Sequence, residues 1–164
     1  HVSNLTKSIY GLGDPQEKVT ETKYDYSAKK IVAIVDTTMD KGKIANALGH
    51  MAFSAGKYFS QNMMGKESLI DADGNLHKGI SKYPFIVLSS NSDHIKSIVR
   101  TVQKNGVDYI DYPEAMFKTG DDNELGKVLS KQSDQKIIYR AVLLVGKSKE
   151  IDSLTIDLPL YKEK

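Results

Sequence analysis

The chain has 164 residues, of which 40% are hydrophobic and 27% charged, with a formal net charge of +2. This composition is ordinary for one globular domain and excludes a low-complexity chain. There is no cysteine, which excludes disulfides and thiolate metal sites and fits a cytoplasmic location. No apolar run approaches a membrane-span length of about 18 residues, so neither a membrane span nor a signal peptide is expected. Because the net charge is small, contact with RNA would require a local basic patch.

The first 28 residues are polar and contain Gly11, Gly13 and Pro15 without a sustained periodicity. We interpret residues 1–28 as an N-terminal extension. Residues 29–164 are then predicted to form a single domain.

The domain is predicted to begin with a strand, a loop and a long helix. Lys30–Asp36 is a short apolar run rich in β-branched residues, which is typical of a buried strand. Asp40 occupies the position of a helix N-cap. After it, apolar residues recur at helical spacing over about five turns. They are Ile44, Leu48, Met51, Ala55 and Tyr58.

Two other flanks of this helix carry distinctive residues. One flank holds polar and basic side chains, namely Lys43, Asn46, His50 and Lys57. On another, glycine recurs every seven residues, at Gly42, Gly49 and Gly56. Glycine inside a helix costs about 1 kcal/mol relative to alanine and suggests close approach of another backbone. We interpret these glycines as letting the helix lie close to its sheet, with ligand contact as the alternative.

Strands and helices alternate through the rest of the chain. A turn near Asp71 joining two short β segments is favoured over a calcium loop, because the twelfth loop position falls on Lys82. The remaining expected elements are strand Tyr83–Ser89, a helix from Asn91 to Gly106, strand Val107–Tyr112, a helix opening at 119–122, strand Ile137–Val145, a short helix around Lys149–Thr155 and an apolar tail Ile156–Tyr161. This order predicts an α/β fold: a single three-layer domain with a mixed or mainly parallel sheet of about four strands flanked by helices.

The start of the first helix is a candidate anion site. Lys41 and Lys43 lie in its first turn, where the helix dipole favours acidic residues over basic ones. Exposed amide groups, the dipole and two ammonium groups together would suit a phosphate or carboxylate. The alternative is a pair of solvated surface lysines.

The segment KIVAIVDTTMDKGKIANALGHMAFSAG resembles the first strand and helix of type II peptidyl-tRNA hydrolases. Lys41, Gly42, Lys43, Ile44, Ala45 and His50 match that pattern, whereas Asn46 and Ala47 depart from it. GISKYPFIVL and YIDYPEAMFKTGDDNEL resemble an uncharacterised branch of the same superfamily, small bacterial proteins of unknown function. The resemblance covers roughly residues 29–160 and implies a peptidyl-tRNA hydrolase II-like fold.

The resemblance also implies catalytic residues. Lys43 and Asp111 match a lysine in the first helical turn and an aspartate after a later strand, a pair that could polarise an ester carbonyl and orient water. His50, on the flank of Lys43, is the third candidate. A structural ion pair and a structural histidine are the alternatives. The sequence departs from the family after Asp111, where Glu114 replaces a basic residue and the expected threonine is absent.

If the strands run parallel, these lysines and carboxylates would face each other across one crevice at the carboxyl edge of the sheet. The predicted ligand-binding residues around it are Asp36, Lys41, Asn46, Tyr112 and Glu114. No metal ligand set, cofactor motif, P-loop or Gly-x-Ser-x-Gly motif occurs.

The leading functional hypothesis is a small cytoplasmic hydrolase that acts on an ester, for example one linked to tRNA. The alternative is a non-catalytic module that uses the same cleft for an anionic ligand or a protein partner. Partners compatible with these hypotheses are tRNA, a small anion and a second copy of the chain.

Overall fold

The computed structural model describes residues 25–162, and most of the predicted N-terminal extension therefore lies outside the described residues. Its main sheet consists of β1 (Lys29–Asp36), β4 (Phe85–Ser90), β5 (Asp108–Pro113) and β6 (Tyr139–Lys147). The α-helices are α2 (Lys41–Tyr58), α3 (Ser92–Asn105), α4 (Asp122–Ser130) and α5 (Ser148–Leu154). A small hairpin is made of β2 (Ser68–Ile70) and β3 (Leu76–Lys78), and two 3₁₀ turns are η1 (Glu114–Phe117) and η2 (Asp134–Lys136).

The four strands lie in the order β4-β1-β6-β5. β1 and β4 are parallel, whereas β6 runs antiparallel to both of its neighbours. β1, β4 and β5 therefore point the same way, and their carboxyl ends share one edge with the start of β6. The mixed four-stranded sheet confirms the coarse α/β prediction.

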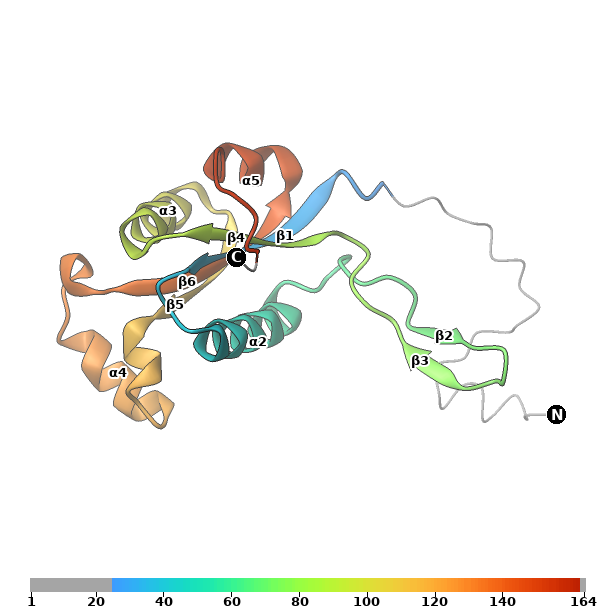
Figure 1. Cartoon of the computed structure of the whole chain (residues 1–164), viewed down its shortest axis with the longest axis horizontal. Coiled ribbons are helices and arrows are strands. Elements are labelled where there is room, and N and C mark those ends of the chain that lie inside the picture. Colours follow the sequence, from blue (N-terminus) through green and yellow to red (C-terminus); the bar gives the residue numbers. More distant parts are fainter. Residues whose placement is uncertain (1–24, 163–164) are drawn as a thin grey trace.

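Helices cover both faces of this sheet (Figure 1). α2 packs on one face, where Ile44, Ala47 and Met51 join a core cluster with Ala141 and Leu143 of β6. α3 and α5 pack on the other face, in a cluster that includes Ile95, Val99 and Ile151. Because β1 and β6 are buried on both faces, their sequences are continuously apolar rather than alternating.

Local signals set the ends of α3 as predicted. Asn91 accepts a hydrogen bond from the backbone amide of His94 at 2.9 Å and so caps the helix. Gly106 ends it with φ = 77°, a left-handed conformation that favours glycine. The predicted tail also packs onto the sheet, since Leu160 forms a β-bridge with Leu88 on the edge strand β4.

The segment around Asp71 is the predicted turn between two short strands. The Asp71 carboxylate accepts hydrogen bonds from the amide of Asn75 at 2.8 Å, from the Asn75 side chain at 3.0 Å and from the amide of Asp73 at 3.0 Å. These bonds, the Asn75 side chain first, lower the pKa of Asp71 to about 2. The hairpin projects away from the main sheet (Figure 1).

Candidate functional site on helix α2

The first turn of α2 is already capped by its own chain. Asp40 accepts a hydrogen bond from the backbone amide of Lys43 at 2.8 Å. Asp40 therefore engages the Lys43 amide, one of the exposed amide groups that were expected to receive an anion beside Lys41 and Lys43. Any anion bound here would contact the lysine ammonium groups from the side of the helix.

One exposed stripe runs along α2, and we call it the α2 flank: Lys43, Asn46, His50, Phe53 and Lys57. Phe53 was not predicted to belong to it, yet its side chain is 86% exposed. Spacings of three and four residues place the five side chains on one side of the helix. The flank runs from Lys43 to Lys57, a separation that corresponds to ~21 Å along the helix axis.

Two aromatic residues of the β5 region support the flank. The Tyr112 hydroxyl donates a hydrogen bond to Asn46 Oδ1 at 3.1 Å, and its ring lies 6.3 Å from the His50 ring. Phe117 packs against Tyr112 with ring centroids 5.1 Å apart, and Lys43 Nζ lies 5.5 Å from the Phe117 centroid. Burial raises the pKa of Tyr112 above its ordinary value of 10.0, so the hydroxyl stays a neutral donor. The structure thus brings together Lys43, Asn46, His50 and Tyr112 as the sequence suggested.

The glycines of α2 face outward rather than toward the sheet. A Cβ atom built on Gly49 or Gly56 would meet no atom within 4 Å. The interpretation that these glycines allow close packing on the sheet is therefore wrong. Instead, Gly49 and Ala45 leave a shallow hollow of about 420 Å³ whose walls include Asn46, His50 and Phe53.

The predicted crevice between Lys43 and Asp111 is not formed. Tyr112 belongs to the core cluster on the α2 face. Side chains alternate along a strand, so the neighbouring Asp111 lies on the α3 face. Consistent with this, burial and then the negative charge of Asp111 raise the pKa of Tyr139, which packs in the α3-side cluster, to about 12. Lys43 and Asp111 are therefore separated by the sheet.

Asp36 also lies on the α3 face, where Arg140 is its partner. Arg140 Nη1 lies 2.9 Å from Asp36 Oδ2, and Asp36 is only 2% exposed. The other carboxylate oxygen accepts hydrogen bonds from the amide of Thr38 at 3.0 Å and from its hydroxyl at 2.8 Å. One oxygen of Asp36 thus holds the β1–α2 loop, and the other pairs with Arg140 of β6.

Asp111 has a raised pKa because burial disfavours its charged form. A carboxyl group whose pKa is raised on folding lowers stability as pH increases from its unfolded value of 3.8 through its folded value. We therefore expect Asp111→Asn to raise the melting temperature at pH 7, with a gain that shrinks as pH falls toward 3.8. Thermal denaturation of both proteins across this range checks the prediction. A destabilising effect at pH 7 would show that the carboxylate makes a favourable contact.

The two other predicted ligand residues lie apart from the centre of the flank. Lys41 is the exposed first residue of α2. Glu114 begins η1, and its carboxylate lies 3.5 Å from the Lys118 ammonium.

Comparison with known proteins gives a family but no activity. Residues 29–162 match the family model DUF2000, described as a protein of unknown function. This chain belongs to the DUF2000 family. The fold is similar to the solved structure of Atu0240, a protein of unknown function from Agrobacterium tumefaciens strain C58, with a TM-score of 0.74 and 20% identity over 82% of this chain and 98% of that chain. A search of curated proteins found no match.

In this DUF2000 member, helix α2 has an excess of positive charge. The helix carries three lysines and no acidic residue, so it alone exceeds the net charge of +2 of the whole chain. Within residues 25–162, no group of three His, Asp or Glu side chains could hold a metal ion. None of the helices in that range is both long and apolar enough to cross a membrane.

Proposed function

We propose that this DUF2000 protein is a non-catalytic module that binds single-stranded RNA, such as the unpaired end of a tRNA, along the α2 flank. The observation that carries the proposal is the exposed combination of Lys43, Phe53 and Lys57 on a helix without acidic residues. Proteins that bind single strands combine basic residues that follow the backbone with aromatic side chains on which bases stack. The flank supplies both.

The remaining features of the flank fit the same ligand. The hollow over Gly49 lets a ligand approach the helix backbone closely, because the outward-facing glycine has no Cβ atom in the way. The amide group of Asn46 is held by Tyr112, so it is oriented before a ligand arrives. The ~15 Å from Lys43 to Phe53 corresponds to about four stacked nucleotides at 3.4 Å each.

Ester hydrolysis, which the resemblance to type II peptidyl-tRNA hydrolases implies, is the second candidate. Its support is that Lys43 and His50 share the flank. The proposed water-orienting carboxylate, Asp111, lies on the other face of the sheet, and Lys43 and His50 are two helical turns apart. Binding without turnover therefore suits the geometry better.

The experiment is a fluorescence anisotropy titration of a labelled oligonucleotide with a tRNA 3′-end sequence. Lys43→Ala with Lys57→Ala should weaken binding and flatten its salt dependence, by about 0.7 in slope for each lost phosphate contact. The matched control is Lys104→Ala with Lys127→Ala, which removes two exposed lysines from α3 and α4. Equal losses in both double variants would indicate non-specific attraction and contradict the proposal.

Peptidyl-tRNA in the same titration separates the two candidates. We expect no cleavage above the uncatalysed rate and unchanged RNA binding by Asp111→Asn. Rapid cleavage that is abolished by Asp111→Asn would establish the hydrolase instead.

A further inference from the structure

A second site lies between η1, α4 and the segment leading into β6, and it shares no residue with the α2 flank. It is a cavity of about 190 Å³. This volume lies below the range of about 300–1,000 Å³ typical of sites for drug-sized molecules. A ligand here would have the size of a small metabolite.

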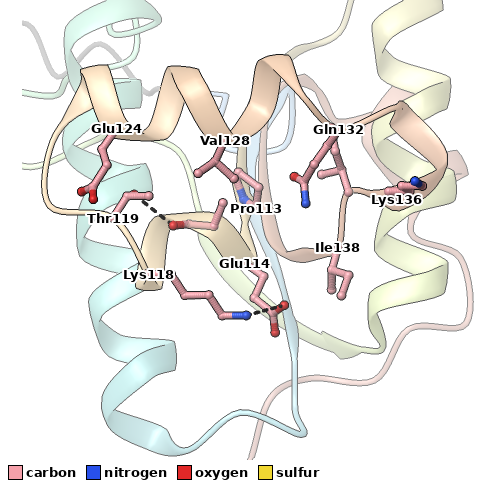
Figure 2. A pocket seen from close by; sticks show the side chains of 11 residues that line it. Pro113, Glu114, Lys118, Thr119, Glu124, Val128, Gln132, Lys136 and Ile138 are labelled. Carbon is pink, nitrogen blue, oxygen red and sulfur yellow. Dashed lines mark hydrogen bonds and ion pairs between the residues drawn. The ribbon is translucent and has the colours of Figure 1, made fainter.

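The walls of this cavity combine an apolar centre with charges of both signs. Figure 2 shows Val128 and Pro113 near the middle, with the Glu114–Lys118 pair at one side and Gln132 at the other. Lys136 adds a second ammonium group to the lining, and Ile138 adds apolar surface. A ligand that matches all of these groups needs an apolar body and both a positive and a negative end.

Several polar and charged groups of the lining can still bind the charged ends of a ligand. Glu114 and Lys118 lie 3.5 Å apart, longer than the 2.7–2.9 Å of a strong charge-assisted bond. An ammonium group has three donors and a carboxylate about four acceptor positions, so one long contact leaves most of them unused. Within the described chain, no hydrogen bond or ion pair engages the side chains of Gln132 or Lys136.

Two other polar side chains of the lining form hydrogen bonds within the protein. Glu124 accepts a hydrogen bond from the amide of Gly120 at 2.7 Å at the start of α4. The Thr119 hydroxyl donates to the carbonyl of Ala115 at 2.9 Å. Of the two carboxylates, Glu114 has the longer contact, at 3.5 Å, and we assign it to the ligand; the basic groups of the lining are Lys118 and Lys136.

We propose that this cavity binds a free α-amino acid with an aliphatic side chain. Glu114 receives the ammonium group, and the neighbouring Lys118 receives the carboxylate. The aliphatic side chain covers Val128 and Ile138. A ligand with both charges matches both members of the Glu114–Lys118 pair, whereas a ligand with a single charge matches only one of them.

The test uses isothermal titration calorimetry of the full chain with L-leucine and three analogues. 4-Methylpentanoate lacks the ammonium group, isoamylamine lacks the carboxylate and glycine lacks the side chain. We expect leucine to bind at least tenfold more tightly than each analogue. Equal affinities for leucine and the two single-charge analogues, or no heat with any of the four, would overturn the proposal.

Variants identify which side chain binds the ammonium group of leucine and which binds its carboxylate. Glu114→Gln should bind leucine and 4-methylpentanoate equally, and Lys118→Met should bind leucine and isoamylamine equally. Lys127→Met, which changes an exposed α4 lysine outside the lining, should bind leucine like the parent. Unchanged selectivity in Glu114→Gln, with the fold verified by circular dichroism, would place leucine elsewhere and contradict the assignment.

Discussion

Replacing Arg140 with alanine is expected to lower the free energy of unfolding by about 3–5 kcal/mol. Its guanidinium lies 2.9 Å from Asp36, which is 2% exposed and holds the loop that leads into α2. Without the arginine, a buried carboxylate would lack its positive partner. Chemical denaturation of the parent and variant at pH 7 measures the loss.

The protein contains a matched control for this experiment. Arg100 and Asp134 form a second pair at 2.7 Å, but both side chains are about half exposed. Removing an exposed partner usually costs about 0–1 kcal/mol, so Arg100→Ala should be nearly neutral. The double variant Asp36→Asn with Arg140→Met should be less damaging than Arg140→Ala, because no unpaired charge remains. Equal losses for Arg140→Ala and Arg100→Ala would show that burial of the Asp36 pair does not matter.

Two neighbouring residues of α2 are expected to respond in opposite ways. Met51 is fully buried in the core cluster on the α2 face, and Met51→Ala should cost about 2–5 kcal/mol through the cavity it leaves. Phe53 is 86% exposed, and Phe53→Ala should change stability by less than about 0.5 kcal/mol.

For RNA affinity, the larger loss should instead come from Phe53→Ala. Loss of a stacking aromatic costs about 1–3 kcal/mol per base, so Phe53→Ala should weaken binding at least about fivefold. Met51→Ala, measured at a temperature where it remains folded, should bind like the parent. Denaturation measures the stability of both variants, and fluorescence anisotropy measures their RNA affinity. A large loss of stability in Phe53→Ala would contradict its exposed position.

Local signals allowed much of the fold to be predicted from sequence. The apolar run of β1, the Asp40 cap and the apolar stripe of α2 each depend on near neighbours in the sequence. All three are confirmed, except that the last residue of the stripe, Tyr58, is 70% exposed. The antiparallel direction of β6 was not predicted, because strand direction depends on partners distant in the chain. The 3₁₀ turn η1 was missed for a related reason: Glu114–Phe117 is too short to show a period.

The candidate site was predicted only in part. The shared flank of Lys43, Asn46 and His50 followed from helical spacing, and the structure shows that all three residues are exposed. The face of Asp111 could not be read from its strand, because Tyr109 and Ile110 are both partly buried, on opposite faces of the sheet, and hide the usual alternation.

Arg140 was overlooked, although a clue was present. A charged residue beside the apolar run of β6 requires a partner, and Asp36 ends the neighbouring strand. The glycines of α2 were misjudged even though they recur away from the apolar stripe. Their seven-residue spacing is visible in the sequence, but which side of the helix they face depends on how the helix packs on the sheet.

Chemical-shift mapping of the full chain during titration with the tRNA 3′-end oligonucleotide tests the α2 flank most directly. We expect the largest amide shifts to lie between residues 43 and 57, and the Phe53 ring signals to move as a base stacks on the ring. Residues of α3 and α5, behind the sheet, should remain unchanged. Shifts centred on the α3 face, or none at saturating RNA, would contradict the proposed function.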